Sequence, residues 1–159
     1  MKPRIDYQAH SPDLQKKLVA LSLASHDCSL DKTLLHLVHI RASQMNGCAF
    51  CLDMHTKEAK IDGERELRLY HLPVWRESPL FTSKEKAALE WTELLTRIPE
   101  HGPVEVIHHR VREELSETEI SDLTFAIGVI NFWNRLRVGS PTTPGSLDNM
   151  FGLTKANLS

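Results

Sequence analysis

Helix start and stop signals divide this chain along its length, and they constrain its fold more than any other feature. Two Ser/Thr-x-x-Glu capping boxes begin at Thr82 and Ser116, where side chain and backbone satisfy each other's hydrogen bonds. Asp31 is a further helix cap, and Gly47 and Gly139 are expected helix ends. No run alternates apolar and polar residues long enough to predict a strand. We therefore predict an all-α fold.

Apolar residues recur at helical spacing between these signals. The predicted helices begin at residue 12 and then run over 32–46, 48–60, 64–71, 83–98, 104–115 and 117–139. The chain has 159 residues, a length that suits one domain with its own core. We place this compact helical bundle at residues 1–139. Residues 140–159 are rich in turn-forming residues and are predicted to form a C-terminal tail.

Composition and charge exclude several classes of function. The formal net charge of −2 gives no electrostatic reason to expect binding to nucleic acid or to an anionic membrane. No apolar run approaches the roughly 18–20 residues that span a bilayer. The first residues lack the apolar core of a signal peptide, and three cysteines are too few for a disulfide scaffold. We therefore expect a cytoplasmic protein with reduced thiols.

The segment Asn46–His55, NGCAFCLDMH, carries the chemistry that the sequence predicts. It places Cys48 and Cys51 three residues apart and His55 four residues further on, so all three share one helix face. A cysteine at a helix start has a lowered pKa, because the unpaired N–H groups there favour a thiolate. The imidazole can accept the thiol proton. In a reducing compartment this pattern indicates a redox dithiol or a metal site.

The redox interpretation is the stronger of the two. A zinc site would use Cys48, Cys51 and His55, with His36 or His39 from the preceding helix as the fourth ligand. Ligands of small zinc modules, however, usually lie on knuckles or on two short elements, not three on one helix face. Two inert buried cysteines are the remaining possibility. The third thiol, Cys28, has no partner that the sequence assigns.

Residues Arg41–His55 resemble the core signature of the AhpD-like branch of the carboxymuconolactone decarboxylase family. The likeness extends through residues 69–81, 85–92 and 130–136, and so covers roughly residues 14–138. It implies an all-α fold of the AhpD-like type and a homo-oligomer, a trimer or a hexamer. It also implies a thiol peroxidase that reduces hydroperoxides and is regenerated by an external dithiol or protein reductant.

Carried over by position, Cys48 and Cys51 match the family's redox pair and His55 matches its proton-relay histidine. The family usually places a glutamate twelve residues before the first cysteine, and this chain has His36 there. A histidine at this position either preserves the relay with a different pH dependence or marks a weakened peroxidase. We expect no organic cofactor and no resident metal.

The predicted reaction starts when a thiolate attacks a hydroperoxide and becomes a sulfenic acid. The second cysteine then condenses with it to a disulfide, which the external dithiol reduces. Cys51, the nearer to His55, is predicted to attack. Cys48, at the exposed helix start, is predicted to resolve the sulfenic acid and to meet the reductant. The alternatives are a disulfide reductase or a thiol redox sensor. A zinc-binding domain and a carboxymuconolactone-type decarboxylase are less favoured, because those decarboxylases do not rely on a cysteine pair.

Overall fold

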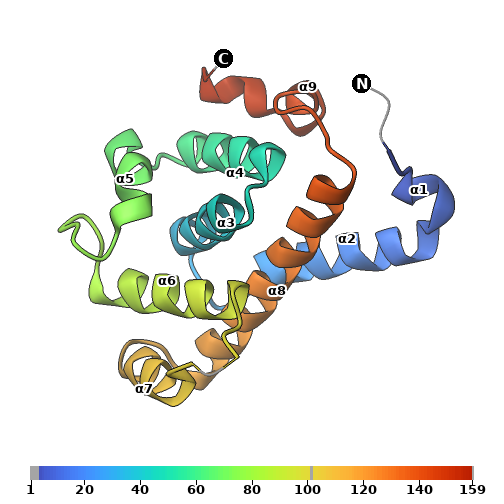
Figure 1. Ribbon diagram of the computed structural model, residues 1–159. Helices are drawn as coiled ribbons and strands as arrows, with labels where there is room; N and C mark the ends of the chain where they lie inside the picture. The colour runs from blue at the N-terminus through green and yellow to red at the C-terminus, as the bar shows by residue number, and fades with distance from the viewer. Residues whose placement is uncertain (1–3, 101, 159) are drawn as a thin grey trace.

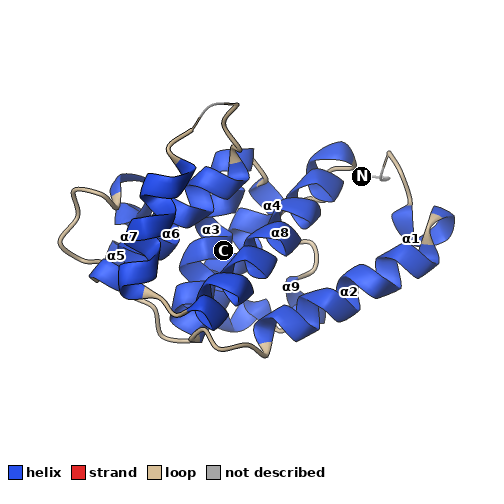
Figure 2. Cartoon of the chain, turned by 90° about the horizontal axis from the view of Figure 1, so that it is seen from below, coloured by secondary structure: helices blue, strands red, loops and turns tan. Residues whose placement is uncertain are grey.

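The computed structural model describes residues 4–100 and 102–158, and every regular element in these two stretches is helical (Figure 2). The all-α prediction is therefore confirmed. None of these helices combines the length and apolar character that crossing a bilayer requires. The elements are α1 (Tyr7–His10), α2 (Pro12–His26), α3 (Lys32–Asn46), α4 (Ala49–Ile61), α5 (Glu66–His71), α6 (Ser83–Thr96), α7 (Val104–Glu114), α8 (Glu117–Gly139) and α9 (Asp148–Phe151), with 3₁₀ turns η1 (Leu72–Val74) and η2 (Leu153–Ala156).

Helix α3 lies at the centre of the bundle, with α4, α6 and α8 packed around it (Figure 1). Most of its residues are buried, and they include two histidines as well as apolar side chains. A helix that is buried on most sides lacks the polar face by which a surface helix is recognised in its sequence pattern. The central position of α3 is what brings its residues into contact with the Cys-x-x-Cys segment at the start of α4.

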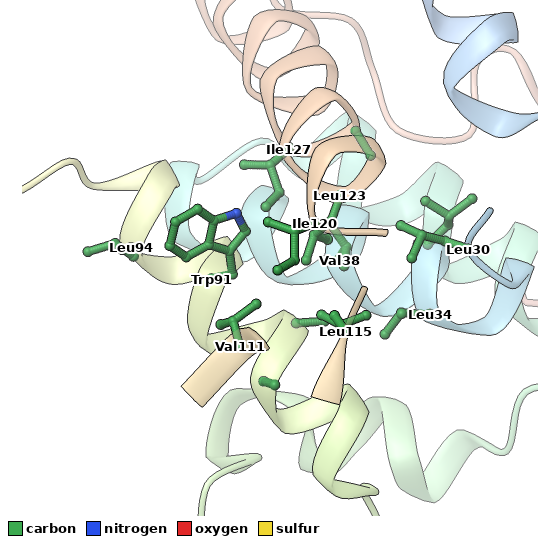
Figure 3. Close-up of a cluster of buried hydrophobic side chains, with 14 of the residues drawn as sticks. Leu30, Leu34, Val38, Trp91, Leu94, Val111, Leu115, Ile120, Leu123 and Ile127 are labelled. Carbon is green, nitrogen blue, oxygen red and sulfur yellow. The ribbon is translucent and has the colours of Figure 1, made fainter. Parts of the chain in front are cut away.

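The main hydrophobic core joins α3, α6, α7 and α8 (Figure 3). Leu34 and Val38 of α3 pack there against Trp91 of α6 and against Leu123 and Ile127 of α8. Each such side chain contributes about 1.5–3 kcal/mol when fully removed from water. This core holds α8 in place, and α8 in turn supplies one wall of the site described below.

Both predicted capping boxes are present. The Thr82 hydroxyl accepts a hydrogen bond from the Glu85 N–H at 3.2 Å, and the Thr82 N–H donates to the Glu85 carboxylate at 2.8 Å. Ser116 and Glu119 form the same reciprocal pair. These two caps fix the starts of α6 and α8, because each satisfies backbone N–H groups that have no partner within the helix.

Helix α5 begins at Glu66, two residues later than predicted. Gly63 adopts a left-handed conformation with φ 92°. Its N–H bonds to the Lys60 carbonyl, and the Glu64 N–H bonds to the Ala59 carbonyl. This pair of bonds is a Schellman ending of α4, so Glu64 belongs to the end of one helix and not to the start of the next.

Two predicted apolar helix faces are only partly buried. Leu18 of α2 is buried, but Leu14 and Leu21 are exposed, because α2 packs against α8 along one side only. Figure 2 shows α1 and the adjoining part of α2 away from α3, α6 and α7. Ile98, predicted to extend the apolar side of α6, lies beyond the helix end at Thr96 and is 80% exposed.

The tail that follows α8 returns across α4, as Figure 1 shows. It contains α9 and η2, which the sequence did not predict, and Leu153 and Ala156 in η2 are buried. The ammonium group of Lys57 on α4 donates to Asp148 of the tail at 2.7 Å. The boundary between domain and tail at residue 139 stays a prediction.

Candidate active site

A glycine turn between α3 and α4 places the first cysteine. Gly47 has φ 66°, which ends α3 in a left-handed conformation that glycine adopts without strain. Its N–H bonds to the Gln44 carbonyl at 3.3 Å, and the Cys48 N–H bonds to the Ser43 carbonyl at 3.0 Å. The turn is again a Schellman ending. Cys48 therefore closes α3 and is also the N-cap residue of α4, one position before the first turn.

Three asparagines hold this turn against α8. Asn46, the last residue of α3, donates to the side-chain oxygens of Asn131 at 3.0 Å and Asn134 at 2.8 Å. Asn134 is fully buried and donates in turn to the Ser43 hydroxyl at 3.1 Å. A buried polar network of this kind stabilises one geometry only when its groups are paired. The network fixes where the cysteines lie relative to α8.

Both cysteines of the pair are free thiols, and each is only 2% exposed. The Cys48 sulfur takes the place of a capping oxygen and accepts a hydrogen bond from the Cys51 N–H at 3.3 Å. Hydrogen bonding from the Cys51 thiol, with the backbone bond and the charge of Arg137, lowers the Cys48 pKa to about 7 against the effect of burial. Cys48 is thus the more acidic sulfur.

The Cys51 thiol has a raised pKa. Its hydrogen bond to Cys48 favours the protonated form, and burial acts in the same direction. Two such close groups titrate as a unit, with one proton shared between them after the first ionisation. The sulfur that carries the resting charge need not be the sulfur that reacts.

A cavity of about 320 Å³ opens beside the pair, walled by α2, α3, α4, α8 and α9. Cys51 and His55 line this cavity, and Cys48 does not. The wall is mainly apolar and includes Phe50, Met54 and Trp133. Phe50 and Met54 pack in the same cluster as the pair, and they also form part of the cavity wall. Of the two cysteines, Cys51 is therefore the one that lines the cavity.

His55 has a carboxylate partner on its own helix. Its Nδ1 lies 2.7 Å from Oε2 of Glu58. Since a carboxylate only accepts, the proton is assigned to Nδ1, and Nε2 is left to exchange a proton elsewhere. Burial would raise the Glu58 pKa, but the hydrogen bond from His55 and the neighbouring imidazoles outweigh it and lower the value.

Glu58 was missed by the sequence analysis. The available signal was its spacing, because residues three apart on a helix are neighbours. The family resemblance predicts an acid twelve residues before the first cysteine. In this chain the acid beside His55 is instead Glu58, three residues after the histidine.

Two further imidazoles follow His55 in a row of tilted rings. The His39 ring lies 4.7 Å from the His55 ring and 5.4 Å from the His26 ring, centre to centre. Burial lowers the pKa of His39 well below its usual value. His39 was predicted as a residue that could face the site, and it does line the cavity. His26 is exposed and also lines the cavity.

His36 lies on another side of α3. Its Nε2 bonds to the Asp62 carboxylate at 2.9 Å, and its buried Nδ1 has no partner among the described residues. It lines a second cavity that shares Glu58 with the first. Neither His55 nor a cysteine hydrogen-bonds to His36 in the described structure. Its role in a relay stays a prediction.

The described residues contain no group of three or more His, Cys, Asp or Glu side chains placed to hold a metal ion. The ligand set considered from the sequence, Cys48, Cys51 and His55 with a histidine of α3, is therefore not assembled as a metal site. Cys28 is partly buried against the main core, whereas Cys48 and Cys51 belong to a different packing cluster.

Comparisons with known proteins show the family to which this chain belongs. The model of the carboxymuconolactone decarboxylase family matches residues 12–94. The uncharacterized protein YdfG of Bacillus subtilis (strain 168) is 41% identical over 138 residues, which are 87% of this chain and 94% of that protein. The chain belongs to the carboxymuconolactone decarboxylase family. Within it, the fold and the Cys-x-x-Cys segment place the chain in the AhpD-like branch.

Solved structures share the fold. ATU0492 of Agrobacterium tumefaciens, a protein of unknown function named as a candidate antioxidant defence protein AhpD, is 41% identical with a TM-score of 0.84. The match covers 90% of this chain and 98% of that chain. The debrominase Bmp8 has a TM-score of 0.78 at 17% identity, over 94% of this chain and 80% of its own. This second likeness shows the fold alone.

Proposed function

We propose that this protein is a thiol peroxidase that reduces hydroperoxides through Cys48 and Cys51, with His55 as the proton relay. The observation that supports it best is the shared cavity wall of Cys51 and His55, with the acidic Cys48 directly behind Cys51. A reactive sulfur, a base and a second sulfur are the groups that this chemistry needs. The branch to which the chain belongs supports the same reaction.

In the first step the pair loses one proton to His55, and the remaining proton moves from Cys51 to Cys48. The Cys51 thiolate then attacks the distal oxygen of the hydroperoxide, and the O–O bond breaks. The imidazolium of His55 returns its proton to the alkoxide that leaves. The products are an alcohol, a Cys51 sulfenic acid and a neutral His55, so the step balances. Glu58 keeps the imidazole oriented and stabilises its charged form.

In the second step the Cys48 thiol attacks the Cys51 sulfenic sulfur, which forms the disulfide and releases water. An external dithiol or protein reductant then restores both thiols and is itself oxidised to a disulfide. Cys48 was predicted to meet this reductant at an exposed helix start. Cys48 is buried, and of the pair only Cys51 lines the cavity, so we instead propose that the reductant attacks the Cys51 sulfur from the cavity. His36 stays a proposed contributor, acting on Glu58 from the second cavity.

The proposal is tested by oxidation of the reduced full chain with one equivalent of cumene hydroperoxide. Peptide mass spectrometry should find a Cys48–Cys51 disulfide within seconds, and cumyl alcohol in equal amount. The rate should rise with pH and level off above a midpoint near 7, because the lowered Cys48 pKa sets the fraction of ionised pair.

Thiols that stay reduced under these conditions would refute the peroxidase. If they do react with a low-molecular-weight disulfide, the result supports a disulfide reductase instead. A stable disulfide that no dithiol donor turns over would support a redox sensor. Zinc content is measured on the same sample, and one tightly bound zinc per chain that protects the thiols would support the structural alternative.

We also propose that the protein is a homo-oligomer, a trimer or a hexamer. Support comes from large apolar side chains that stay exposed on neighbouring helices, at Leu14, Leu21 and Leu23 of α2 and Phe125 and Phe132 of α8. Exposed patches of this kind usually mark interaction surfaces. Sedimentation velocity measures the mass directly, and a monomer at micromolar concentration would refute the proposal. The cytoplasmic location stays a prediction from the sequence.

A further inference from the structure

An arginine without a carboxylate partner lies in the cavity wall. The guanidinium carbon of Arg137, on α8, is 4.8 Å from the centre of the Phe50 ring and 5.6 Å from that of Trp133. The group donates a hydrogen bond to the Thr142 hydroxyl at 2.9 Å. No carboxylate in the described parts of the chain forms an ion pair with it. Neutral groups therefore hold this positive charge in place.

Phe50 links the guanidinium to the cysteine pair. It lies between Cys48 and Cys51 in the first turn of α4, and its side chain packs in the same buried cluster as both cysteines. Arg137 and Cys51 also line the same cavity. The aromatic faces shield the guanidinium from water on one side, which strengthens its interaction with any nearby anion. In the buried cluster that contains Phe50, the two thiols are the groups that can become anionic.

The other titratable groups around the cavity do not supply an equivalent charge. Burial lowers the pKa of His39, on α3, and also that of His26, on α2, so both favour the neutral form. His55 is paired with the Glu58 carboxylate on α4. Among the described residues that line the cavity, only Arg137 is an arginine or a lysine. Its charge is also present at every pH at which the thiols titrate.

We propose that Arg137 is a positioning residue whose fixed charge holds the cysteine pair in its reactive thiolate form. The proposal rests on the proposed function, because a peroxidase needs that thiolate at neutral pH. It also predicts a specific electrostatic effect, since a nearby opposite charge lowers the pKa of an acid. The Arg137 charge is in fact among the causes that lower the pKa of Cys48, and it acts in the same direction on Cys51.

The test compares three variants of the full chain. Arg137→Met removes the charge and keeps an apolar side chain against Phe50, and Arg137→Lys keeps the charge. Arg76→Met is the matched control, because Arg76 also lies over an aromatic ring, that of Trp75 at 4.3 Å, but pairs with Glu93 outside the cavity. The measurement is the rate of alkylation by iodoacetamide against pH, followed at Cys48 and Cys51 by peptide mass spectrometry.

Arg137→Met should raise the midpoint of alkylation by about one pH unit, which slows alkylation at pH 7 about fivefold. Arg137→Lys should keep the midpoint close to that of the unaltered protein, and Arg76→Met should leave it unchanged. Circular dichroism and thermal melting identify the folded variants. An unchanged midpoint in folded Arg137→Met protein would overturn the proposal.

Binding of the substrate is a different role that the same variants separate. If Arg137→Met raises KM for a hydroperoxide that carries a carboxylate, but not for cumene hydroperoxide, and leaves the midpoint unchanged, the guanidinium binds substrate and the proposal is wrong. Alkylation does not require peroxidase activity. A protein whose thiols never react with hydroperoxide would therefore refute the proposed function, while the midpoints would still decide the role of Arg137.

Discussion

Replacing Cys51 with serine is expected to reduce hydroperoxide consumption to the rate of the protein-free reaction. Cys51 is the cysteine of the pair that lines the cavity, so we expect a hydroperoxide in the cavity to react with it. A serine hydroxyl does not ionise at neutral pH and cannot form a sulfenic acid. The measurement is loss of cumene hydroperoxide with an excess of a dithiol donor. The substitution is small, and the fold should persist because the core of α3, α6, α7 and α8 lies elsewhere.

Two matched variants make this result specific. Cys48→Ser should permit one oxidation, leave Cys51 as a sulfenic acid that dimedone traps, and stop turnover because the resolving thiol is absent. Cys28→Ser should keep full activity, since Cys28 packs against the main core away from the pair. A dimedone adduct on Cys48 in the Cys51→Ser variant would reverse the two roles. That outcome would mean that the low pKa of Cys48 outweighs the access of Cys51 to the cavity.

The helices of this chain could be predicted because their ends are set by local signals. Asp31, Thr82 and Ser116 accept hydrogen bonds from N–H groups three residues along the chain, as residues at helix caps do. Gly47 ends α3 where only a residue tolerant of positive φ fits without strain. The same local order placed Cys48, Cys51 and His55 on one helix start. The sequence did not show, however, that Cys51 and His55 line the cavity while Cys48 does not.

The contribution of α3 to the site could not be predicted in the same way. His36 and His39 are three residues apart and both are buried, so the helical period does not tell which of them meets α4 at His55. The packing around α3 places the His39 ring beside that of His55 and brings His36 into a hydrogen bond with Asp62. The match by position to the family's motif favours His36 as the partner of His55, but the residue that contacts His55 is His39. Position in a motif and contact in the fold are different properties.

Short elements held by distant contacts were also invisible in the sequence. The four-residue helix α9 is too short to be stable alone, so its sequence carries no helical period. It forms where Asp148 meets Lys57, ninety-one residues earlier in the chain. Its residue Phe151 is part of the cavity wall. Arg137 is a similar case, because only the path of α8 over α4 brings it to Phe50.

Replacing His55 with glutamine is expected to slow the oxidation of Cys51 by about 10²–10⁴-fold, the usual contribution of a positioned general acid or base. Glutamine can still hydrogen-bond to Glu58, but it cannot take the thiol proton or return it to the leaving alkoxide. The rate constant is measured by stopped flow, from the loss of free thiol after mixing with cumene hydroperoxide. His71→Gln is the control. His71, the last residue of α5, hydrogen-bonds to Ser78 and lies outside the cavity.

Glu58→Gln separates the chemistry of the imidazole from its orientation. The amide oxygen still accepts the Nδ1–H of His55, but the charge that stabilises the imidazolium is lost, so the rate should fall only about tenfold. The larger loss should therefore belong to His55→Gln, with Glu58→Gln between it and the unaltered protein. Equal rates in His55→Gln and the His71→Gln control would show that the His55 imidazole takes no part in the reaction. A loss in Glu58→Gln as large as in His55→Gln would instead identify the carboxylate as the group that moves the proton.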